Sequence, residues 1–424
     1  MEYKTFIYYI FLLQIIKTIL SLRIPFQNNI NTSTITEENF INELSDVNIT
    51  TNFLLGTPYQ NISFYIKLQK YNLIVLSYKA LNAKYINNFN QDNSSSFKSD
   101  DRIAINYGLL DTEFCRRSKD IFNIDSDFFF HFNFLLAYDN YNNQSGILGL
   151  KFRDSYQNYS FLYQLNQNKI IHSNIFYFKF SRYNFNDGEI IFGSLPHENE
   201  HLKYDLKYFY TTNLKPSKSY QQDYNIIIDK IFIGNTNIEQ NQIFTFNFEN
   251  YFLKVPFNYL KIFQEEYLKD LIEKEKCKKQ LYYMNRNSYY ICDNDINIKK
   301  LKKIKFYSHD LDFMFVLTPE DLFIKGKEKL FLLITFSESL SKEWSFGYNF
   351  LKKYTIVFDQ DRKVIGFYKI IENNNSNIYS LLWVITIIFG LIIIGLVNFI
   401  YVLKKNKKNK ALELEEHFAY ASSI

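Results

Sequence analysis

Short apolar segments separated by Asn, Asp, Gly and Ser recur from about residue 46 to residue 370, and they limit the chain to a β-rich fold. Clear examples of predicted strands or hairpins are 188–195, 224–235, 329–336 and 353–370. Aromatic residues make up 19% of the sequence, and they favour strands over helices. Only 160–171 and 256–276 have helical spacing of apolar residues. The sequence therefore predicts a mostly β protein with a few short helices.

The segment GTPYQNISFYIKLQKYNLIVLS, residues 56–77, begins as a turn and continues as two strands. Phe64, Ile66 and Leu68 alternate, as in a strand with one buried face. The continuous apolar run 73–76 is typical of a strand buried on both faces. Lys67 interrupts this pattern next to the point where the first strand should end.

An internal repeat divides the chain into two halves. SGILGL at 145–150 and WSFGYNFL at 344–351 each place a glycine, Gly149 or Gly347, inside a bulky apolar run. Each follows an earlier turn and strand, and a strand glycine often marks the close approach of another backbone. We expect two β-rich lobes, 46–180 and 181–370, with a cleft between them.

Both ends of the chain carry membrane signals. Residues 1–22 have an apolar stretch after Lys4 and are predicted to be a secretory signal peptide. Residues 23–45 look polar and irregular, as in a linker or pro-segment. Near the other end, 379–403 is long and apolar enough to span a bilayer. A lysine cluster follows at once and places the tail 404–424 in the cytosol.

This topology predicts a single-pass type I membrane protein of the secretory route, the cell surface or the endolysosomal system. Residues 371–378 would form a short stalk below a lumenal or extracellular ectodomain. Sequons at 31, 48, 61, 93, 143, 158 and 374 would be usable glycan acceptors there. The net charge of +5 and the absence of a recognisable motif argue against a nucleic-acid partner.

The three cysteines have different expectations. Cys277 and Cys292 flank a predicted hairpin, so in an oxidising compartment they favour a disulfide that closes a short loop. Cys115 is expected to be a small buried apolar residue rather than a catalytic thiol.

Taken together, these segments resemble the pepsin-type (A1) aspartic peptidase family. LLGTPYQNISFYIKL resembles the family's opening turn and strand, in which Gly56 lies, and SGILGL resembles a conserved block except at Ser145. INYG at 105–108 resembles the flap strand, with Tyr107 and Gly108 at the flap positions. The segments 188–195, 224–235 and 344–367 resemble later blocks in the same order, and the cysteine pair falls where the second lobe usually has a disulfide. The resemblance implies a two-lobed acid-protease fold, and membrane-anchored members of the β-secretase type share this layout.

The same resemblance exposes a departure at the catalytic positions. The family uses two aspartates, one from each lobe, which share a proton and activate water. Counting from the Gly-Thr-Pro turn puts Lys67-Leu68-Gln69 at the first Asp-Thr-Gly position, and counting back from Pro256 puts Asn247-Phe248-Glu249 at the second. No Asp or Glu lies between Asp46 and Asp92, so the first loss does not depend on the alignment. Glu249 is the one carboxylate near this centre.

Two interpretations of Lys67 remain open. In the first, the position drifted after catalysis was lost, and the lysine stem extends to water. In the second, Lys67 pairs with Glu249 across the lobes or binds an anion, because a buried lysine needs a partner. The flap also departs, with Leu109 and Leu110 where the family prefers small residues.

Three functions follow. In the first, the chain is an inactive homologue whose lobes bind a peptide, protein or glycan or have a structural role. In the second, it is an aspartic endopeptidase that uses unusual residues such as Glu249. In the third, it is a surface scaffold that does not use the cleft. No cofactor and no metal are expected.

Overall fold

The computed structural model describes residues 21–81, 87–108, 111–125, 128–139, 145–152, 157–181, 186–200, 203–214, 224–282, 286–338 and 344–369. Met1–Lys369 form one compact unit and Ile370–Ile424 a second. The second unit lies outside the described residues, as do the predicted stalk, spanning segment and tail and most of the predicted signal peptide. Among the described residues, no helix has the length and apolar character needed to cross a membrane.

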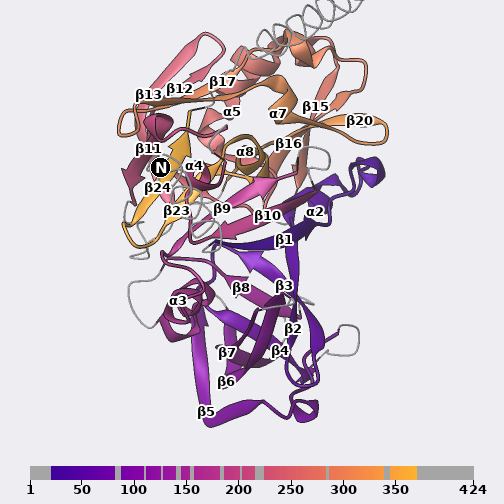
Figure 1. The fold of residues 1–424 in the computed structure, drawn as a ribbon. Coiled ribbons are helices and arrows are strands. Elements are labelled where there is room, and N and C mark those ends of the chain that lie inside the picture. The colour runs from indigo at the N-terminus through magenta and orange to yellow at the C-terminus, as the bar shows by residue number, and fades with distance from the viewer. Residues whose placement is uncertain are drawn as a thin grey trace, which may run out of the picture. The chain divides into compact units, whose positions relative to one another are not determined.

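The unit is mostly β, and its first sheet has thirteen strands in the order β11-β24-β23-β9-β10-β1-β2-β3-β8-β4-β7-β6-β5. Figure 1 shows β1, β9 and β10 lying side by side. In chain order the strands are β1 (Leu22–Asn28), β2 (Ile49–Leu55), β3 (Gln60–Lys67), β4 (Leu73–Leu81), β5 (Lys98–Gly108), β6 (Asp111–Asp125), β7 (Phe128–Asp139), β8 (Gly146–Gly149), β9 (Ile175–Phe180), β10 (Asp187–Phe192), β11 (Phe209–Asn213), β23 (Ile356–Asp359) and β24 (Val364–Tyr368).

The second sheet has eleven strands, ten in the order β18-β17-β12-β13-β22-β14-β21-β16-β20-β19, with β15 paired to β16. Its strands are β12 (Asn225–Ile233), β13 (Thr236–Phe246), β14 (Leu253–Pro256), β15 (Cys277–Tyr282), β16 (Asn287–Asp293), β17 (Ile304–Ser308), β18 (Phe313–Leu317), β19 (Phe323–Lys325), β20 (Lys329–Leu332), β21 (Ile334–Ser337) and β22 (Trp344–Phe346).

The helices are short. The α-helices are α2 (Phe40–Ser45), α3 (Phe161–Gln167), α4 (Pro196–Asn199), α5 (Leu260–Phe263), α6 (Lys269–Glu273), α7 (Pro319–Leu322) and α8 (Tyr348–Lys353). The 3-10 turns are η1 (Thr32–Thr34), η3 (Gln91–Asn93), η4 (Gln157–Tyr159), η5 (Leu206–Tyr208), η6 (Phe257–Tyr259) and η8 (Ile298–Lys300), and η7 (Gln264–Leu268) is a π-helical segment. The two predicted helical stretches are confirmed as α3 and as the succession η6, α5, η7 and α6.

The strands of the opening segment follow their apolar pattern. In β3, Ile62, Phe64 and Ile66 are buried and alternate with more exposed residues. The run 73–76 opens β4, which lies between β8 and β7, and all four of its side chains are buried. A strand with neighbours on both sides and cover on both faces needs such a continuous apolar run.

Residues 23–45 are not the irregular linker that their polar composition predicted. β1 pairs with six residues of β10 and with the start of β2, and its alternating residues Ile24 and Phe26 are buried. Pro25 is tolerated because β2 pairs with β1 only at Gln27 and Asn28, so β1 has a single ladder partner at the proline. The predicted end of the signal peptide at residue 22 also falls inside β1, whose first residue is Leu22.

The segment after β1 is also integrated into the fold. Phe40 stacks on Phe331 with ring centroids 4.6 Å apart. Val47 N donates to Glu249 O at 2.7 Å, and Tyr251 N donates to Leu44 O at 2.9 Å. These contacts join residues 40–47 to the second half of the chain.

The first sheet also continues across the expected lobe boundary at residue 180. This boundary falls between β9 and β10, which form an antiparallel pair. β23 and β24, from the end of the unit, join this sheet through the pairing of β23 with β9. The first sheet therefore takes strands from both halves of the sequence, because the β23–β24 hairpin near the end of the unit pairs with β9.

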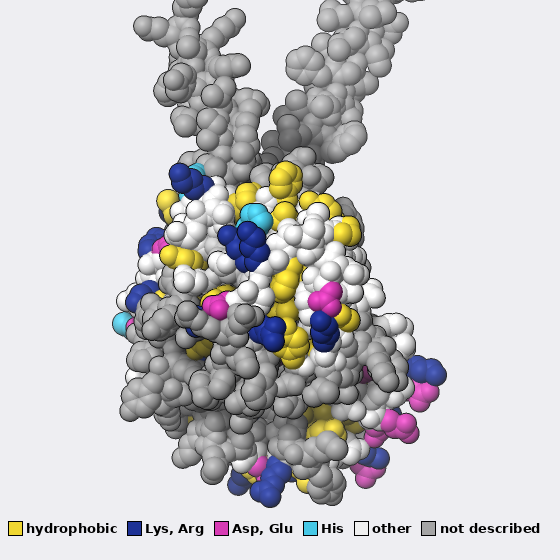
Figure 2. Space-filling view, turned by 90° about the horizontal axis from the view of Figure 1, so that it is seen from below, with side chains coloured by type: hydrophobic (Ala, Val, Ile, Leu, Met, Phe, Trp, Pro, Cys, Tyr) yellow, Lys and Arg dark blue, Asp and Glu magenta, His cyan; other side chains and the backbone are white. Residues whose placement is uncertain are grey.

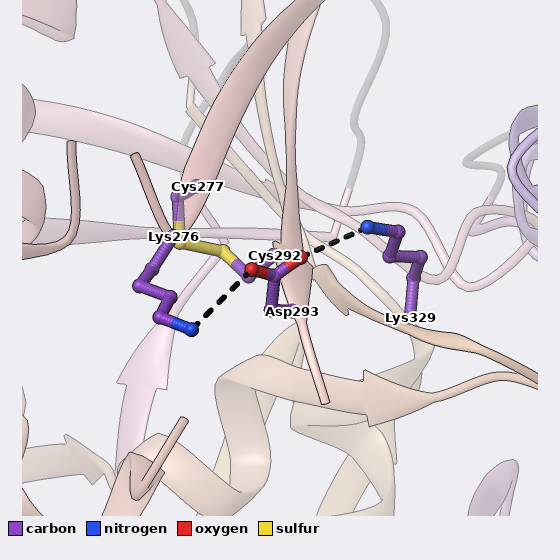
Figure 3. The surroundings of a disulfide bond; sticks show 5 residues. All are labelled: Lys276, Cys277, Cys292, Asp293 and Lys329. Atoms are coloured by element: carbon purple, nitrogen blue, oxygen red, sulfur yellow. Dashed lines mark hydrogen bonds and ion pairs between the residues drawn. A yellow bond between two sulfur atoms is a disulfide. The ribbon is translucent and has the colours of Figure 1, made fainter. Parts of the chain in front are cut away.

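The predicted disulfide is confirmed. Cys277 and Cys292 pair directly across the β15–β16 hairpin and form a disulfide. Figure 3 shows the bond beside Asp293, which forms ion pairs with Lys276 and Lys329 at 3.7 and 2.9 Å. Cys115 is fully buried in a small apolar cluster, as expected.

The surface of the described residues mixes charges of both signs. Figure 2 shows lysine or arginine and acidic side chains on one face, with apolar side chains emerging among them. This distribution agrees with the small net charge of +5 for 424 residues.

Candidate functional site

The two halves of the chain contain the same arrangement of four strands. In the first half, β3 runs parallel to β8, β8 runs antiparallel to β4, and β4 runs parallel to β7. In the second half, β13 runs parallel to β22, β22 runs antiparallel to β14, and β14 runs parallel to β21. β8 and β22 contain the repeated glycine blocks or lead into them, so the repeat in the sequence corresponds to a repeat in the fold.

The two repeat glycines permit equivalent close approaches. A Cβ added to Gly149 would lie 2.6 Å from the carbonyl oxygens of Lys70 and Asn72. A Cβ added to Gly347 would lie 2.6 Å from the carbonyl oxygen of Asn250 and against that of Phe252. Lys70 therefore corresponds to Asn250, because both carbonyl groups press on the same side of an equivalent glycine.

This correspondence relates the two turns that sequence counting singled out. Lys67 lies three residues before Lys70, and Asn247 lies three residues before Asn250. Lys67 is the last residue of β3, and Asn247 follows the last residue of β13 directly. Lys67 and Asn247 thus occupy equivalent points of the two halves.

The two turns meet. Lys67 Nζ lies 3.1 Å from Glu249 Oε2 and forms an ion pair with it. The Lys67 side chain is 9% exposed, whereas the Glu249 side chain is 32% exposed. Beside this pair, Gln69 Nε2 donates to the backbone oxygen of Phe246 at 3.4 Å. Of the residues predicted to matter here, the structure brings Lys67 and Glu249 together and leaves Asn247 out of the ion pair.

Asn247 has a local role instead. Its Oδ1 accepts a hydrogen bond from the backbone N of Glu249 at 3.1 Å, and its own N donates to Phe346 O at 2.9 Å. Phe248 between them is buried, with its ring close to those of Phe178 and Phe358. Phe248 therefore anchors the second turn in the core, and Asn247 closes the turn by its hydrogen bond. Glu249 is the residue of this turn that contacts Lys67.

The chemistry available at this meeting point is that of one carboxylate and one ammonium group. The Glu249 carboxylate is paired with the Lys67 ammonium group, and this arrangement differs from a pair of carboxylates that share one proton. Among the described residues, no group of three or more His, Cys, Asp or Glu side chains is arranged to hold a metal ion.

The predicted flap residues lie at the end of a hairpin strand. Tyr107 and Gly108 end β5 and pair with Thr112 and Asp111 of β6. The side chain of Tyr107 and the two leucines at 109 and 110 lie outside the described part of the chain.

A buried carboxylate near the opening turn escaped the sequence reasoning. Asp120 is fully buried and accepts hydrogen bonds from Ser94 Oγ at 2.8 Å and Ser96 Oγ at 2.5 Å. Ser94 Oγ also accepts from the backbone N of Thr57 at 2.9 Å, next to Gly56 with its φ of +86°. The cluster holds the Gly-Thr-Pro turn in place. No local sequence signal marks Asp120, because its partners lie 24 and 26 residues away.

Lys352 of α8 is a second residue that the sequence did not single out. Its Nζ donates to Tyr251 Oη at 2.9 Å. Burial lowers the pKa of Lys352 to about 8, although the nearby charge of Asp321 raises it in part. Burial also raises the pKa of Tyr251.

Comparison with known proteins agrees with this architecture. A family model described as eukaryotic aspartyl protease matches residues 50–370, which include both four-strand arrangements and both turns. No curated protein matches the chain. The match covers more than half of the sequence, and the chain belongs to the eukaryotic aspartyl protease family.

Proposed function

We propose that this chain is a membrane-anchored member of its family that has lost acid-peptidase chemistry and serves in binding or in a structural role. The observation that carries the proposal is the Lys67–Glu249 ion pair of 3.1 Å at the meeting point of the two equivalent turns. The family mechanism needs two carboxylates there that share a proton. Lys67 and Asn247, at equivalent points of the two halves, supply none.

The neighbouring positions support the same conclusion. An Asp-Thr-Gly turn needs a glycine two residues after the aspartate, and this chain has Gln69 and Glu249 at those two points. Glu249 lies two residues beyond the dyad-equivalent Asn247 and is engaged by Lys67. The two turns lie at equivalent points of the two halves, and their side chains form an ion pair between Lys67 and Glu249.

Proteolysis tests the proposal directly. The ectodomain unit, from residue 21 to residue 369, is incubated with a denatured protein at acidic pH, with and without pepstatin, beside an active pepsin-type enzyme. We expect the control enzyme to cleave in a pepstatin-sensitive manner and this chain to leave the substrate intact. Pepstatin-sensitive cleavage by this chain would contradict the proposal.

The alternative is an endopeptidase that uses unusual residues. The observation that favours this alternative is the exposure of Glu249, whose side chain is 32% exposed at the meeting point and can therefore be reached by water or a substrate. The substitution Glu249→Gln separates the two: it abolishes cleavage if Glu249 is catalytic, and there is no cleavage to abolish if the chain is inactive.

The binding role could use the expected cleft or the outer surface. Gln69 is exposed and lies beside the ion pair, so Gln69→Trp places a bulky side chain at this point without replacing a buried residue. Loss of binding to a peptide or protein partner in this variant supports use of the cleft. Unchanged binding supports a surface scaffold.

The topology remains part of the proposal. An apolar segment at 379–403, the lysine cluster from Lys404 and the disulfide all fit a type I protein with a lumenal or extracellular domain. The signal peptide would end before Leu22, since that residue opens β1. Protease added to sealed vesicles from expressing cells tests this orientation. A cytosolic tail should be digested, and the lumenal domain should be protected.

A further inference from the structure

Four side chains form a row across four strands of the first sheet. Asn61 of β3 lies directly opposite Leu54 of β2, Leu54 lies opposite Asn123 of β6, and Asn123 lies opposite Phe129 of β7. Directly opposed residues in neighbouring strands project to the same face. The row Asn61–Leu54–Asn123–Phe129 therefore shares one face of the sheet.

That face is turned to solvent. Leu54 is 38% exposed and Phe129 is 61% exposed, and both are among the large apolar residues that the described surface leaves open. The neighbours of Leu54 along β2, Phe53 and Leu55, are buried, as is Phe122 beside Asn123. The core thus lies under the opposite face, and the row is an apolar surface interrupted by one amide.

The first member of this row is a sequon asparagine. Asn61-Ile62-Ser63 fits the acceptor pattern for N-glycosylation, with Asn61 exposed and Ile62 buried. Within the described residues, the Asn61 side chain makes no hydrogen bond to the protein. The Asn61 side chain is therefore exposed on the same face as Leu54, where a sugar can be attached to it.

Two other sequon asparagines differ from Asn61. Asn31 Oδ1 accepts hydrogen bonds from Ser33 N at 3.1 Å and Ser33 Oγ at 2.7 Å. Asn48 is half-buried, its Oδ1 is enclosed, and its Nδ2 donates to Asp46 at 3.5 Å. A glycan on Asn48 would have to displace its surroundings, so Asn48 is a matched negative control.

We propose that Asn61 carries an N-linked glycan whose sugars cover Leu54 and extend over Asn123 towards Phe129. The donor is a lipid-linked pyrophosphate oligosaccharide. A bond forms between Asn61 Nδ2 and C1 of the first sugar, the bond between C1 and the phosphate oxygen breaks, and Nδ2 loses one proton. The lipid pyrophosphate leaves with the electron pair of the broken bond.

A glycan fits this row better than a protein partner does. Stable protein interfaces bury an area of roughly 800 Å² on each partner, whereas this row is one residue wide and is interrupted by Asn123. Sugar rings have apolar faces and polar rims, so they can cover Leu54 while their hydroxyl groups bond to Asn123 and water. The inference rests on the lumenal topology proposed above.

Occupancy is tested on the full-length chain expressed in a eukaryotic secretory host. Peptide N-glycosidase digestion in heavy-oxygen water converts a glycosylated asparagine to a labelled aspartate, which mass spectrometry locates. We expect the label at residue 61 and not at residue 48. Asn61→Gln and Ser63→Ala should each remove one glycan step from the electrophoretic mobility, and Asn48→Gln should remove none. An unlabelled Asn61 beside other labelled sequons overturns the inference alone.

The covering role has a separate readout. Both Asn61→Gln and Ser63→Ala should raise the binding of a hydrophobic dye and lower the yield of monomer, although Ser63→Ala keeps the asparagine. Adding Leu54→Ser to either variant should reverse the change. If the glycan is lost and neither property moves, the covering role is wrong. If no sequon of the chain is glycosylated, the lumenal topology fails as well, while the loss of peptidase chemistry is untouched.

Discussion

Lys67 Nζ and Glu249 Oε2 lie 3.1 Å apart, so residues separated by 182 positions in the sequence form an ion pair where the two repeated halves meet. The pair is asymmetric, because the lysine side chain is 9% exposed and the glutamate side chain 32% exposed. Removing one partner of a buried pair leaves an uncompensated charge, and the cost depends on how well water reaches the group that remains.

This asymmetry predicts different effects for the two single substitutions. Glu249→Gln leaves the buried lysine without its carboxylate partner and should lower the free energy of unfolding by about 1–3 kcal/mol. This value lies below the range for fully buried pairs, because water reaches part of the site. Lys67→Met leaves a carboxylate that water can reach, so its effect should be smaller. Urea denaturation of the two variants and the double variant measures both effects and the coupling.

The Lys230–Glu239 pair is the matched control. It has the same 3.1 Å separation, but its side chains are 44% and 63% exposed. Glu239→Gln should therefore change stability little, because exposed pairs are screened by water. Equal effects of Glu239→Gln and Glu249→Gln would contradict the importance of burial at the central pair.

The Cys277–Cys292 disulfide predicts a dependence of stability on redox state. The two cysteines are 15 residues apart, and closing a loop of this size stabilises a fold by about 3 kcal/mol in the chain-entropy account. A reductant should lower the unfolding midpoint of the natural chain by a corresponding amount. The double variant Cys277→Ser/Cys292→Ser should start at the lower midpoint and show no response to reductant. A response in that variant would place the sensitivity elsewhere.

Gly149→Ala and Gly347→Ala should both be strongly destabilising. In each case the new methyl group meets backbone carbonyl oxygens, which cannot move without shifting a strand or turn. We expect a loss of about 3 kcal/mol or more, at the upper end of overpacking effects. Gly366→Ala is the control, since its nearest neighbours are ring atoms of the Phe209 side chain rather than backbone atoms. Thermal unfolding of the three variants ranks the costs, and a Gly366→Ala cost equal to the others would contradict the argument.

Lys352 predicts a rise in stability with pH. Its pKa is lowered from 10.5 to about 8, with burial as the main cause, so between these values the unfolded chain binds more protons than the folded chain. Stability from this group therefore increases as pH rises from about 8 towards 10, by something on the order of 2 kcal/mol. Above this range, buried tyrosines with raised pKa values, such as Tyr251, reverse the trend.

The measurement compares the natural chain with Lys352→Met. Chemical denaturation from pH 7 to pH 9.5 should show a rising free energy of unfolding for the natural chain and a flatter profile for the variant. Parallel profiles would show that Lys352 titrates alike in the folded and unfolded chain.

The sequence by itself determined the local elements and the family. Alternating apolar residues in β3, the continuous run in β4 and the cysteines that flank the β15–β16 hairpin are local patterns, and local patterns reflect local geometry. The repeated glycine blocks likewise indicated two similar halves. The sequence also showed that no Asp or Glu occurs between Asp46 and Asp92, so the first half has no acidic residue close to Lys67 along the chain.

Only the tertiary structure decided which distant residues meet. Composition suggested an irregular linker at 23–45, yet β1 and α2 are ordered there because β10, β2 and the second half cover their apolar residues. The sequence left open whether Lys67 reaches water or pairs with Glu249, and the structure places the ion pair. The buried Asp120 and the row that begins at Asn61 were likewise invisible to pattern reading. In each case the partners come from separate strands, and their proximity depends on sheet pairing rather than on spacing along the chain.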